Sequence, residues 1–205
     1  DPVPTAAANA FLASDVTLRP MEGQDVSRAF EMPYHAADET IPVGLYSALE
    51  FFIECAPSGT PGVAPAWGPA IRMCKVAETI TPGVDVEYTP ITDDPEDGGI
   101  YFHIGPTRYV LLGARGDFTF TLNAQGIPGM KYMMTGLFTL PSTQAMAVPD
   151  YTDFMDPKVA TKANTPTFTI GGIPFTMRSF EFKRGNQVEP RMLIGKEEIV
   201  IPDAK

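Results

Sequence analysis

Two glutamates and two histidines are the side chains best suited to acid–base chemistry in this sequence. Glu50 and Glu54 lie four residues apart in a stretch that alternates like a β-strand, so both side chains point to the same face of the strand. A glycosidase also uses a pair of carboxylates. Strand rise separates them by about 13 Å, which is too far for that reaction, and we interpret them as an outward acidic stripe. His35 and His103 are distant in sequence, and neither belongs to a metal-binding spacing. We therefore expect no catalytic residues and no enzymatic activity.

Three further patterns suggest binding sites, and each has a simpler explanation. Residues 92–99 form an acidic turn, but their spacing differs from the alternating ligands of a calcium loop, which favours a solvated loop. Met130, Met133 and Met134 occupy both faces of one predicted strand, so they cannot converge on a soft metal. Residues 115–117 read Arg-Gly-Asp, an integrin-type tripeptide that recurs often by chance. We expect neither a metal nor a cofactor.

Residues 111–140 carry the strongest structural pattern, and the rest of the chain is organised around them. Apolar and polar residues alternate from Asp117 to Asn123, as in a strand with one buried face. Two glycines and a proline at 125–129 permit a reversal, and the alternation resumes from Met130 to Leu140. The pattern predicts a long β-hairpin with one face in a core. The other face of the second strand is less polar, so we expect another subunit to cover it.

Other segments predict further strands and one helix. Residues 44–55 alternate cleanly between two faces and predict a strand. Helical spacing of apolar residues from Trp67 to Ala77, with Pro69 in the first turn, predicts a helix of about three turns. Shorter strands are expected near residues 84–88, 100–104, 109–112, 168–170, 175–177, 179–183 and 198–201, with reversals at 105–108, 171–172 and 186–187.

Segments with little periodicity are expected to form arms and loops. Residues 1–15 predict an extended arm or an edge strand, and residues 17–30 allow only a short strand because Pro20 and Gly23 interrupt it.

Residues 31–42 and 141–164 predict long exposed loops. Because strands in adjacent hairpins dominate, the predicted fold is mainly β: an antiparallel β-sandwich or barrel with one flanking α-helix, forming a single domain over residues 1–205.

Composition excludes several classes of protein. No apolar run approaches the roughly 20 residues of a membrane-spanning helix, so we expect no association with a membrane. The formal net charge of -10 argues against a protein that grips nucleic acid, because binding phosphates requires lysine and arginine. Cys55 and Cys74 are too few for a disulfide framework, so free thiols are expected.

Several of these stretches resemble the tail tube, or major tail, proteins of long-tailed bacteriophages and prophages. The resemblance spans most of the chain in consistent order. The matching motifs are APAWGP at 64–69, Cys74, AET at 77–79, LLGARG at 111–116, GIP at 126–128, TGLF at 135–138, PDY at 149–151 and GNQ at 185–187. Family members carry a basic segment before the equivalent of Asp1 and further strands beyond Lys205, so we expect this chain to be a truncated piece.

The resemblance implies a β-sandwich or barrel that assembles as stacked hexameric rings around a channel for DNA. The expected partners are other copies of the chain and other tail proteins, with DNA as a non-specific passing cargo. The implied location is the virion tail, after assembly in the bacterial host cytoplasm. Open sheet edges and a hairpin with two apolar faces suit such an assembly, since ring symmetry supplies partners for both.

Two sets of residues are candidates for surfaces in such an assembly. The outward faces of the long hairpin are expected to line the channel, because their opposite faces belong to the core: these residues are Thr119, Thr121, Asn123, Lys131 and Thr135. Contacts between subunits are expected at Tyr34, His35, Met133, Tyr151 and Phe154.

Two alternative functions remain open at this point. One is another phage tail β-domain, such as a terminator, baseplate or adhesin module that binds a protein or a glycan. A glycan binder needs exposed aromatic residues clustered in a groove, and the candidates are dispersed in sequence: Tyr34, Tyr46, Trp67, Tyr101 and Tyr151. The other is a β-sandwich hydrolase, which needs convergent acids that the sequence does not identify.

Overall fold

The computed structural model describes residues 3–31 and 37–202, and it is mainly β, with 49% strand and 4% helix. The predicted fold class is confirmed. The helices are α1 (Ala6–Asn9) and α2 (Gly68–Arg72). The strands are β1 (Ser14–Ser27), β2 (Thr40–Glu54), β3 (Val76–Thr81), β4 (Asp85–Pro90), β5 (Gly98–Ile104), β6 (Thr107–Asn123), β7 (Gly129–Leu137), β8 (Ser142–Thr143), β9 (Thr169–Ile170), β10 (Ile173–Pro174), β11 (Ser179–Lys183), β12 (Glu189–Leu193) and β13 (Lys196–Val200).

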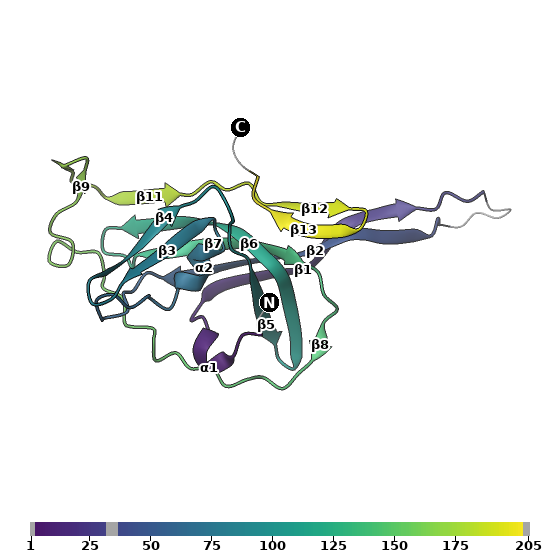
Figure 1. Cartoon of the computed structure of the whole chain (residues 1–205), viewed down its shortest axis with the longest axis horizontal. Coiled ribbons are helices and arrows are strands. Elements are labelled where there is room, and N and C mark those ends of the chain that lie inside the picture. The colour runs from purple at the N-terminus through teal and green to yellow at the C-terminus, as the bar shows by residue number, and fades with distance from the viewer. Residues whose placement is uncertain (1–2, 32–36, 203–205) are drawn as a thin grey trace.

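One curled antiparallel sheet of seven strands forms the centre of the molecule (Figure 1). Its main order is β1-β2-β7-β6-β11, and β5 and β8 pair with the first part of β6. The 17-residue β6 pairs first with β5 and later with β11. Between these parts the register with β7 shifts from Leu112 to Arg115, where Gly113 has φ +56°. Such a bulge bends a strand, so β6 can pair with β5 and β8 through its first part and with β11 through its last part.

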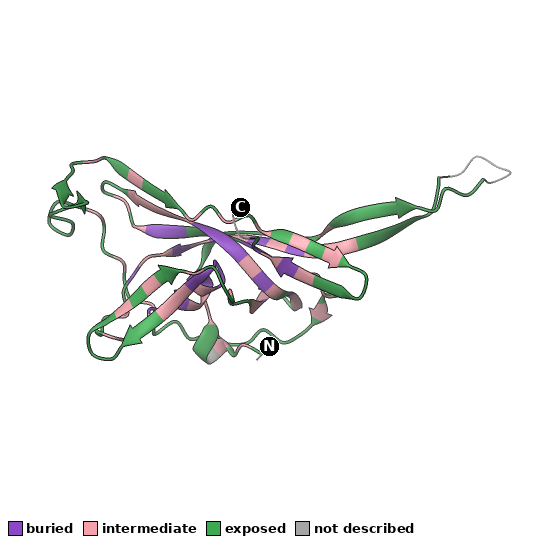
Figure 2. Ribbon diagram, turned by 45° about the horizontal axis from the view of Figure 1, so that its top comes forward, coloured by how far each residue is buried: buried purple, intermediate pink, exposed green. Residues whose placement is uncertain are grey.

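The predicted hairpin at 111–140 is confirmed as β6 and β7, and its inner face lies in the core. Cross-strand rows run through three strands, as in the row of Phe51, Tyr132 and Phe118. Tyr132 is fully buried, with its ring 5.3 Å from that of Phe51 and 6.1 Å from that of Phe118. A second layer of α2 and the β3–β4 hairpin packs on this face through Ile71 and Cys74 (Figure 2).

The helix predicted from Trp67 to Ala77 is much shorter than expected. Pro69 stands in its first turn as predicted, but α2 ends at Arg72. Lys75 adopts φ 63°, outside the helical region, and the following residues pair with β4 as strand β3. Apolar residues at helical spacing here reflect a buried turn and a half-buried strand, since β-branched Val76, Thr79 and Ile80 favour a strand.

The amino-terminal prediction is also corrected. Strand β1 runs for 14 residues through Pro20 and Gly23, with register shifts against β2 on either side of Glu22. These irregularities absorb the proline and the glycine, which would otherwise break the ladder. Upstream, residues 10–13 belong to no strand or helix, so of the two expectations, an extended arm or an edge strand, the edge strand is absent there, and Ala6–Asn9 form the short helix α1. The ring of Phe11 packs on the core at 6.4 Å from that of Phe51.

Loops and reversals agree with prediction in part. The reversals at 105–108 and 171–172 are confirmed, and 141–164 is a long connection containing only β8. The predicted loop at 31–42 is shorter, because β2 begins at Thr40. The predicted turn at 186–187 lies instead at 194–195, between β12 and β13.

The C-terminal hairpin β12–β13 covers part of the outer face of the sheet. Arg115 donates from Nη1 to the carbonyl of Ile199 at 2.6 Å and from Nη2 to that of Pro95 at 3.1 Å. Ile199 is buried beneath the hairpin. Among the described residues, no helix is long and apolar enough to cross a membrane.

Candidate assembly surfaces

The most prominent surface is a two-stranded ribbon that leaves the body of the molecule (Figure 1). We call it the arm and define it as residues 20–31 and 37–45. Its strands pair Val26 with Ile41 and Gln24 with Val43, and nearly all of its residues are exposed (Figure 2). Within the arm, β1 contributes residues 20–27, which extend about 26 Å at 3.3 Å per residue, and β2 contributes residues 40–45.

Polar contacts hold the distal end of the arm together. Arg28 donates from Nη1 to Glu39 Oε2 at 2.6 Å, and its guanidinium lies 4.5 Å from the ring centre of Phe30. Asp38 accepts from the hydroxyl of Ser27 at 3.3 Å. These contacts are exposed, so each contributes little free energy. Backbone hydrogen bonds between β1 and β2, and not the burial of side chains, therefore hold the two strands of the arm together.

Large apolar side chains remain uncovered along the arm. Val26 is 52% exposed and stands directly across from Ile41, which is 48% exposed. Met21, Phe30 and Val43 are also exposed. Scattered single apolar residues on a surface are ordinary, but Val26 and Ile41 face each other, and Val43 is two residues farther along the same face of β2, so these three form an apolar strip.

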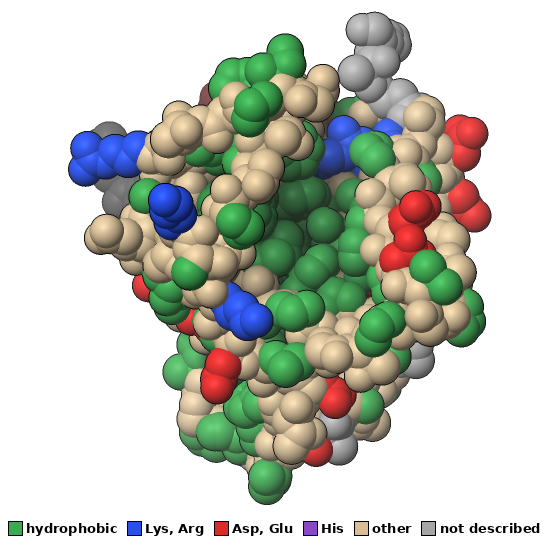
Figure 3. Space-filling model, turned by 90° about the vertical axis from the view of Figure 1, so that its left-hand side faces the viewer, with side chains coloured by type: hydrophobic (Ala, Val, Ile, Leu, Met, Phe, Trp, Pro, Cys, Tyr) green, Lys and Arg blue, Asp and Glu red, His purple; other side chains and the backbone are tan. Residues whose placement is uncertain are grey.

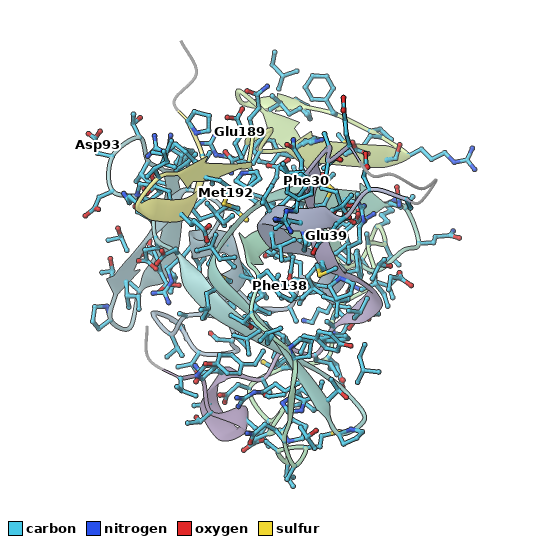
Figure 4. All side chains as sticks on the ribbon, turned by 90° about the vertical axis from the view of Figure 1, so that its right-hand side faces the viewer. Phe30, Glu39, Asp93, Phe138, Glu189 and Met192 are labelled. Atoms are coloured by element: carbon cyan, nitrogen blue, oxygen red, sulfur yellow. The ribbon has the colours of Figure 1, made fainter. Side chains whose placement is uncertain are left out.

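A shallow depression lies where the arm joins the body. Val43, Gly44 and Tyr46 form one wall, and Met192 of β12 forms the other. Gly44 has φ +63°, and a Cβ at this position would lie 3.4 Å from Met192 Cγ, so the backbone conformation there requires glycine. Met192 lies against the base of the arm at Gly44, and Figure 4 looks along the arm from its distal end, which carries Phe30 and Glu39.

The five residues predicted to line a channel come from one face of the sheet. Thr119 pairs with Lys131, and the alternation of β6 places Thr121 and Asn123 on the same side. Thr135 is farther along this face, opposite Arg115, at the margin covered by the C-terminal hairpin. The structure thus brings this set together as an outer face rich in threonine.

Positive charges on this outer face are paired with carboxylates. Lys131 Nζ lies 3.1 Å from Glu50 Oε2, and Arg19 donates to Glu50 Oε1 at 2.8 Å. The hydrogen bond from Lys131, assisted by the charges of both cations, lowers the pKa of Glu50. Lys183 Nζ lies 3.9 Å from Asp117 Oδ2. Glu50 is thus held in an ion-pair cluster with Arg19 and Lys131.

The predicted contacts between subunits lie in separate places. Met133 is 39% exposed on the outer face, where its strand neighbour across β2 is Glu50. Tyr151 is 40% exposed and its ring meets that of Phe154 edge-on at 6.4 Å, while Phe154 itself packs on the core. The other two predicted contacts, Tyr34 and His35, lie outside the described residues.

The end of the sandwich opposite the arm is open. The edge strand β11 pairs with the last part of β6, placing Phe182 across from Phe120 on the face that points toward the second layer. Phe180 packs 6.4 Å from Phe120 and 5.4 Å from Phe168, yet Phe182 remains 48% exposed. Figure 3 shows a hollow at this end with a hydrophobic lining. We call it the aromatic hollow.

Sequence reasoning missed a polar clip that joins the C-terminal segment to the core. Asn186 donates from its backbone N–H to Asp117 Oδ1 at 3.0 Å. Its side-chain amide donates to the carbonyls of Cys74 at 2.7 Å and Gly116 at 3.0 Å. Asp117 is 3% exposed, so the Arg-Gly-Asp tripeptide is not an accessible ligand. Burial, with a smaller contribution from the charge of Asp117, raises the pKa of the Cys74 thiol.

Both cysteines are free, as expected, with Cys74 buried and Cys55 partly exposed. Throughout residues 3–31 and 37–202, no group of three or more His, Cys, Asp or Glu side chains is arranged to hold a metal ion. Comparison with protein-family models, with curated proteins and with solved structures finds no match to this chain.

Proposed function

We propose that this chain is a structural subunit of a bacteriophage tail, a tail tube protein that self-assembles into stacked hexameric rings around a channel for DNA. The proposal combines the motif resemblance described above with the mainly β fold. In this role the chain acts by shape and symmetry, not by catalysis. Its partners are other copies of itself and other tail proteins.

The observation that carries the proposal is the arm. A ribbon of two strands is marginally stable in water by itself, and this one exposes apolar side chains such as Val26 and Ile41. The long edge strand β1 also presents backbone groups that can pair with another chain. In an assembly, neighbouring copies cover the apolar side chains of the arm and pair with the edge strand β1.

The outer face of the sheet suits a channel wall. Thr119 and Thr121 are uncharged, and the charge of Lys131 is balanced by Glu50. Because non-specific DNA affinity grows with each cation that contacts a phosphate, a wall with paired cations lets DNA pass. The net charge of -10 acts in the same direction.

The alternative of a glycan-binding tail module gains no support from three of its candidate residues, Trp67, Tyr101 and Tyr151. Trp67 packs on Tyr88 and donates its indole N–H to the carbonyl of Ala56, whereas Tyr101 is beneath Arg108 in another strand. Tyr151 belongs to a third region of the chain. These rings serve local packing at separate positions.

Electron microscopy of the purified full-length protein tests the proposal. Six-membered rings or tubes are the expected result, and a monodisperse monomer that binds glycans would contradict it. The channel is tested separately by mixing assembled tubes with duplex DNA at moderate salt. Wild-type tubes should not retain DNA, Glu50→Lys tubes should retain it, and Glu87→Lys, which reverses an exposed charge on β4, is the matched control.

A further inference from the structure

Charge is distributed unevenly between the two ends of this acidic molecule. Residues 20–45, which span the arm, contain one arginine against five carboxylates: Glu22, Asp25, Glu31, Asp38 and Glu39. Residues 158–187, which approach and include β11, contain one carboxylate, Glu181, against five cations: Lys158, Lys162, Arg178, Lys183 and Arg184. The two segments therefore carry formal charges of -4 and +4, and Figure 1 places them at opposite ends.

Residues 158–178 of the basic segment lie beside the aromatic hollow, whereas Lys183 pairs with Asp117 on the outer face of the sheet. Ala160 exchanges backbone hydrogen bonds with the β6–β7 turn at Gln125 and Gly126, and the carbonyl of Arg178 accepts from Ala124. These contacts hold residues 158–178 against the open end of the sandwich. In Figure 3, Lys and Arg side chains lie at the top and the left of the hollow, and Asp and Glu side chains lie at its right. An apolar recess with cations along part of its rim, which we call the cationic border, thus faces away from the arm.

The arm has the complementary chemistry. It is narrow, it exposes the pair of Val26 and Ile41, and carboxylates flank that pair on both strands. Two arms placed together would oppose two segments of charge -4, which disfavours a symmetric arm-to-arm contact. An arm placed in the hollow of a neighbour instead covers both apolar surfaces and brings opposite charges together.

We propose that the arm of one subunit docks in the aromatic hollow of a second copy, with Val26 and Ile41 near Phe182 and the acidic arm residues near the cationic border. The inference rests on the proposed self-assembly and specifies its contact. The arm and the aromatic hollow lie at opposite ends of the subunit, so the interface is heterologous. It propagates from copy to copy and either closes into rings or continues as a filament.

Two interface variants and their mixture test this contact. Val26→Asp removes the apolar strip of the arm, and Phe182→Asp removes the exposed ring of the hollow. Each variant alone should remain monomeric in light scattering at concentrations where the wild type assembles. Mixed in equal amounts, they should form dimers and no larger species, because only the intact arm of the Phe182→Asp chain and the intact hollow of the Val26→Asp chain can join.

Ile104→Asp is the matched control, since Ile104 is 54% exposed at the end of β5, away from both surfaces. It should assemble as the wild type does. Circular dichroism and the thermal midpoint establish that each variant is folded. Assembly of folded Phe182→Asp at the wild-type concentration would overturn the docking contact while leaving self-assembly intact. A wild type that stays monomeric at every concentration would overturn both.

Charge reversal supplies a second test that avoids the aromatic ring. Replacing Lys158, Lys162 and Arg178 by glutamate should raise the assembly concentration at least tenfold, because the formal charge of the basic segment changes from +4 to -2 and the segment then repels the arm. Combining this variant with a chain carrying Glu22→Lys and Asp25→Lys should recover most of the loss. Failure of the second set to compensate would contradict the pairing of these two ends. Added salt should weaken wild-type assembly as it screens the contact.

Discussion

The two ends of the β1–β2 hairpin differ in how their side chains are buried. In the body, β2 alternates strictly, with Leu49, Phe51 and Ile53 buried and the residues between them facing outward. In the arm, both faces of the same two strands are exposed, and apolar side chains such as those of Val26 and Ile41 remain uncovered. One hairpin therefore contains a part that is stabilised by burial and a part that is not.

Because only the body is buried, the residues that stabilise the fold and the residues that are available for association lie in different parts of the hairpin. Substitutions in the body should change the free energy of unfolding, whereas substitutions in the arm should leave it nearly unchanged and alter assembly. The following measurements, taken on the monomer by chemical denaturation, test that separation from the largest expected effect to the smallest.

Tyr132→Ala should have the largest effect, a loss of about 3–5 kcal/mol in the free energy of unfolding. The ring is fully buried between Phe51 and Phe118, so its removal leaves a cavity that the sheet cannot close. Tyr132→Phe is the control and should cost about 1 kcal/mol or less, because the hydroxyl contacts only the sulfur of Met130. A small effect of the alanine variant would mean that the body is not a close-packed core.

Asn186→Ala should cost about 1–3 kcal/mol, since the carbonyls of Cys74 and Gly116 lose their amide donor in a partly buried site. Asn164→Ala is a matched control, because Asn164 donates to Val159 in an exposed loop. If the two variants were equally stable, the clip would not hold the C-terminal segment to the core.

Cys74 should make the body sensitive to alkaline pH. Burial raises the pKa of its thiol above the unfolded value. Its contribution to stability is therefore complete below the unfolded pKa of about 8.5 and is lost as pH rises above it, by about 1.4 kcal/mol per pH unit. The slope should be smaller in Cys74→Ala between pH 8.5 and 10, where the remaining slope comes from Cys55, whose pKa is also raised by burial. An identical slope in both proteins would show that the thiol ionises freely.

Val26→Thr should have the smallest effect, within about 0.5 kcal/mol, because an exposed side chain is replaced by another β-branched one. The same variant should weaken assembly, which analytical ultracentrifugation measures. A loss in the monomer comparable to that of Asn186→Ala would place the arm within the cooperative fold and remove the distinction between the two ends.

Local alternation was enough to predict the body of the fold. The faces of residues 44–55 and of the hairpin at 111–140 follow directly from period-two patterns, which are dictated by burial on one side. The helix at 67–77 was overestimated because short apolar runs satisfy both periods, and Lys75 with positive φ carries no sequence signal.

The candidate surfaces were less predictable for a physical reason. Pro20 and Gly23 are ordinarily strand breakers, and only the bulged pairing with β2 tolerates them, so the arm was not recognised as a strand. The clip at Asn186 depends on residues some 70 and 112 positions away in the chain. The threonines of the outer face were grouped correctly because adjacent strands of one hairpin keep their register.

The pairing of β2 with β7 has a consequence for synthesis on the ribosome. Glu54 ends one strand and Gly129 begins the other, so about 75 residues are translated between them, roughly 4–15 s at 5–20 residues per second. During this interval β1 and β2 can form a ribbon, but Phe51 has no Tyr132 to cover it. Emergence of β7 is therefore the step that closes the sheet, and a nascent chain halted before Gly129 should be captured by chaperones that bind exposed apolar strands.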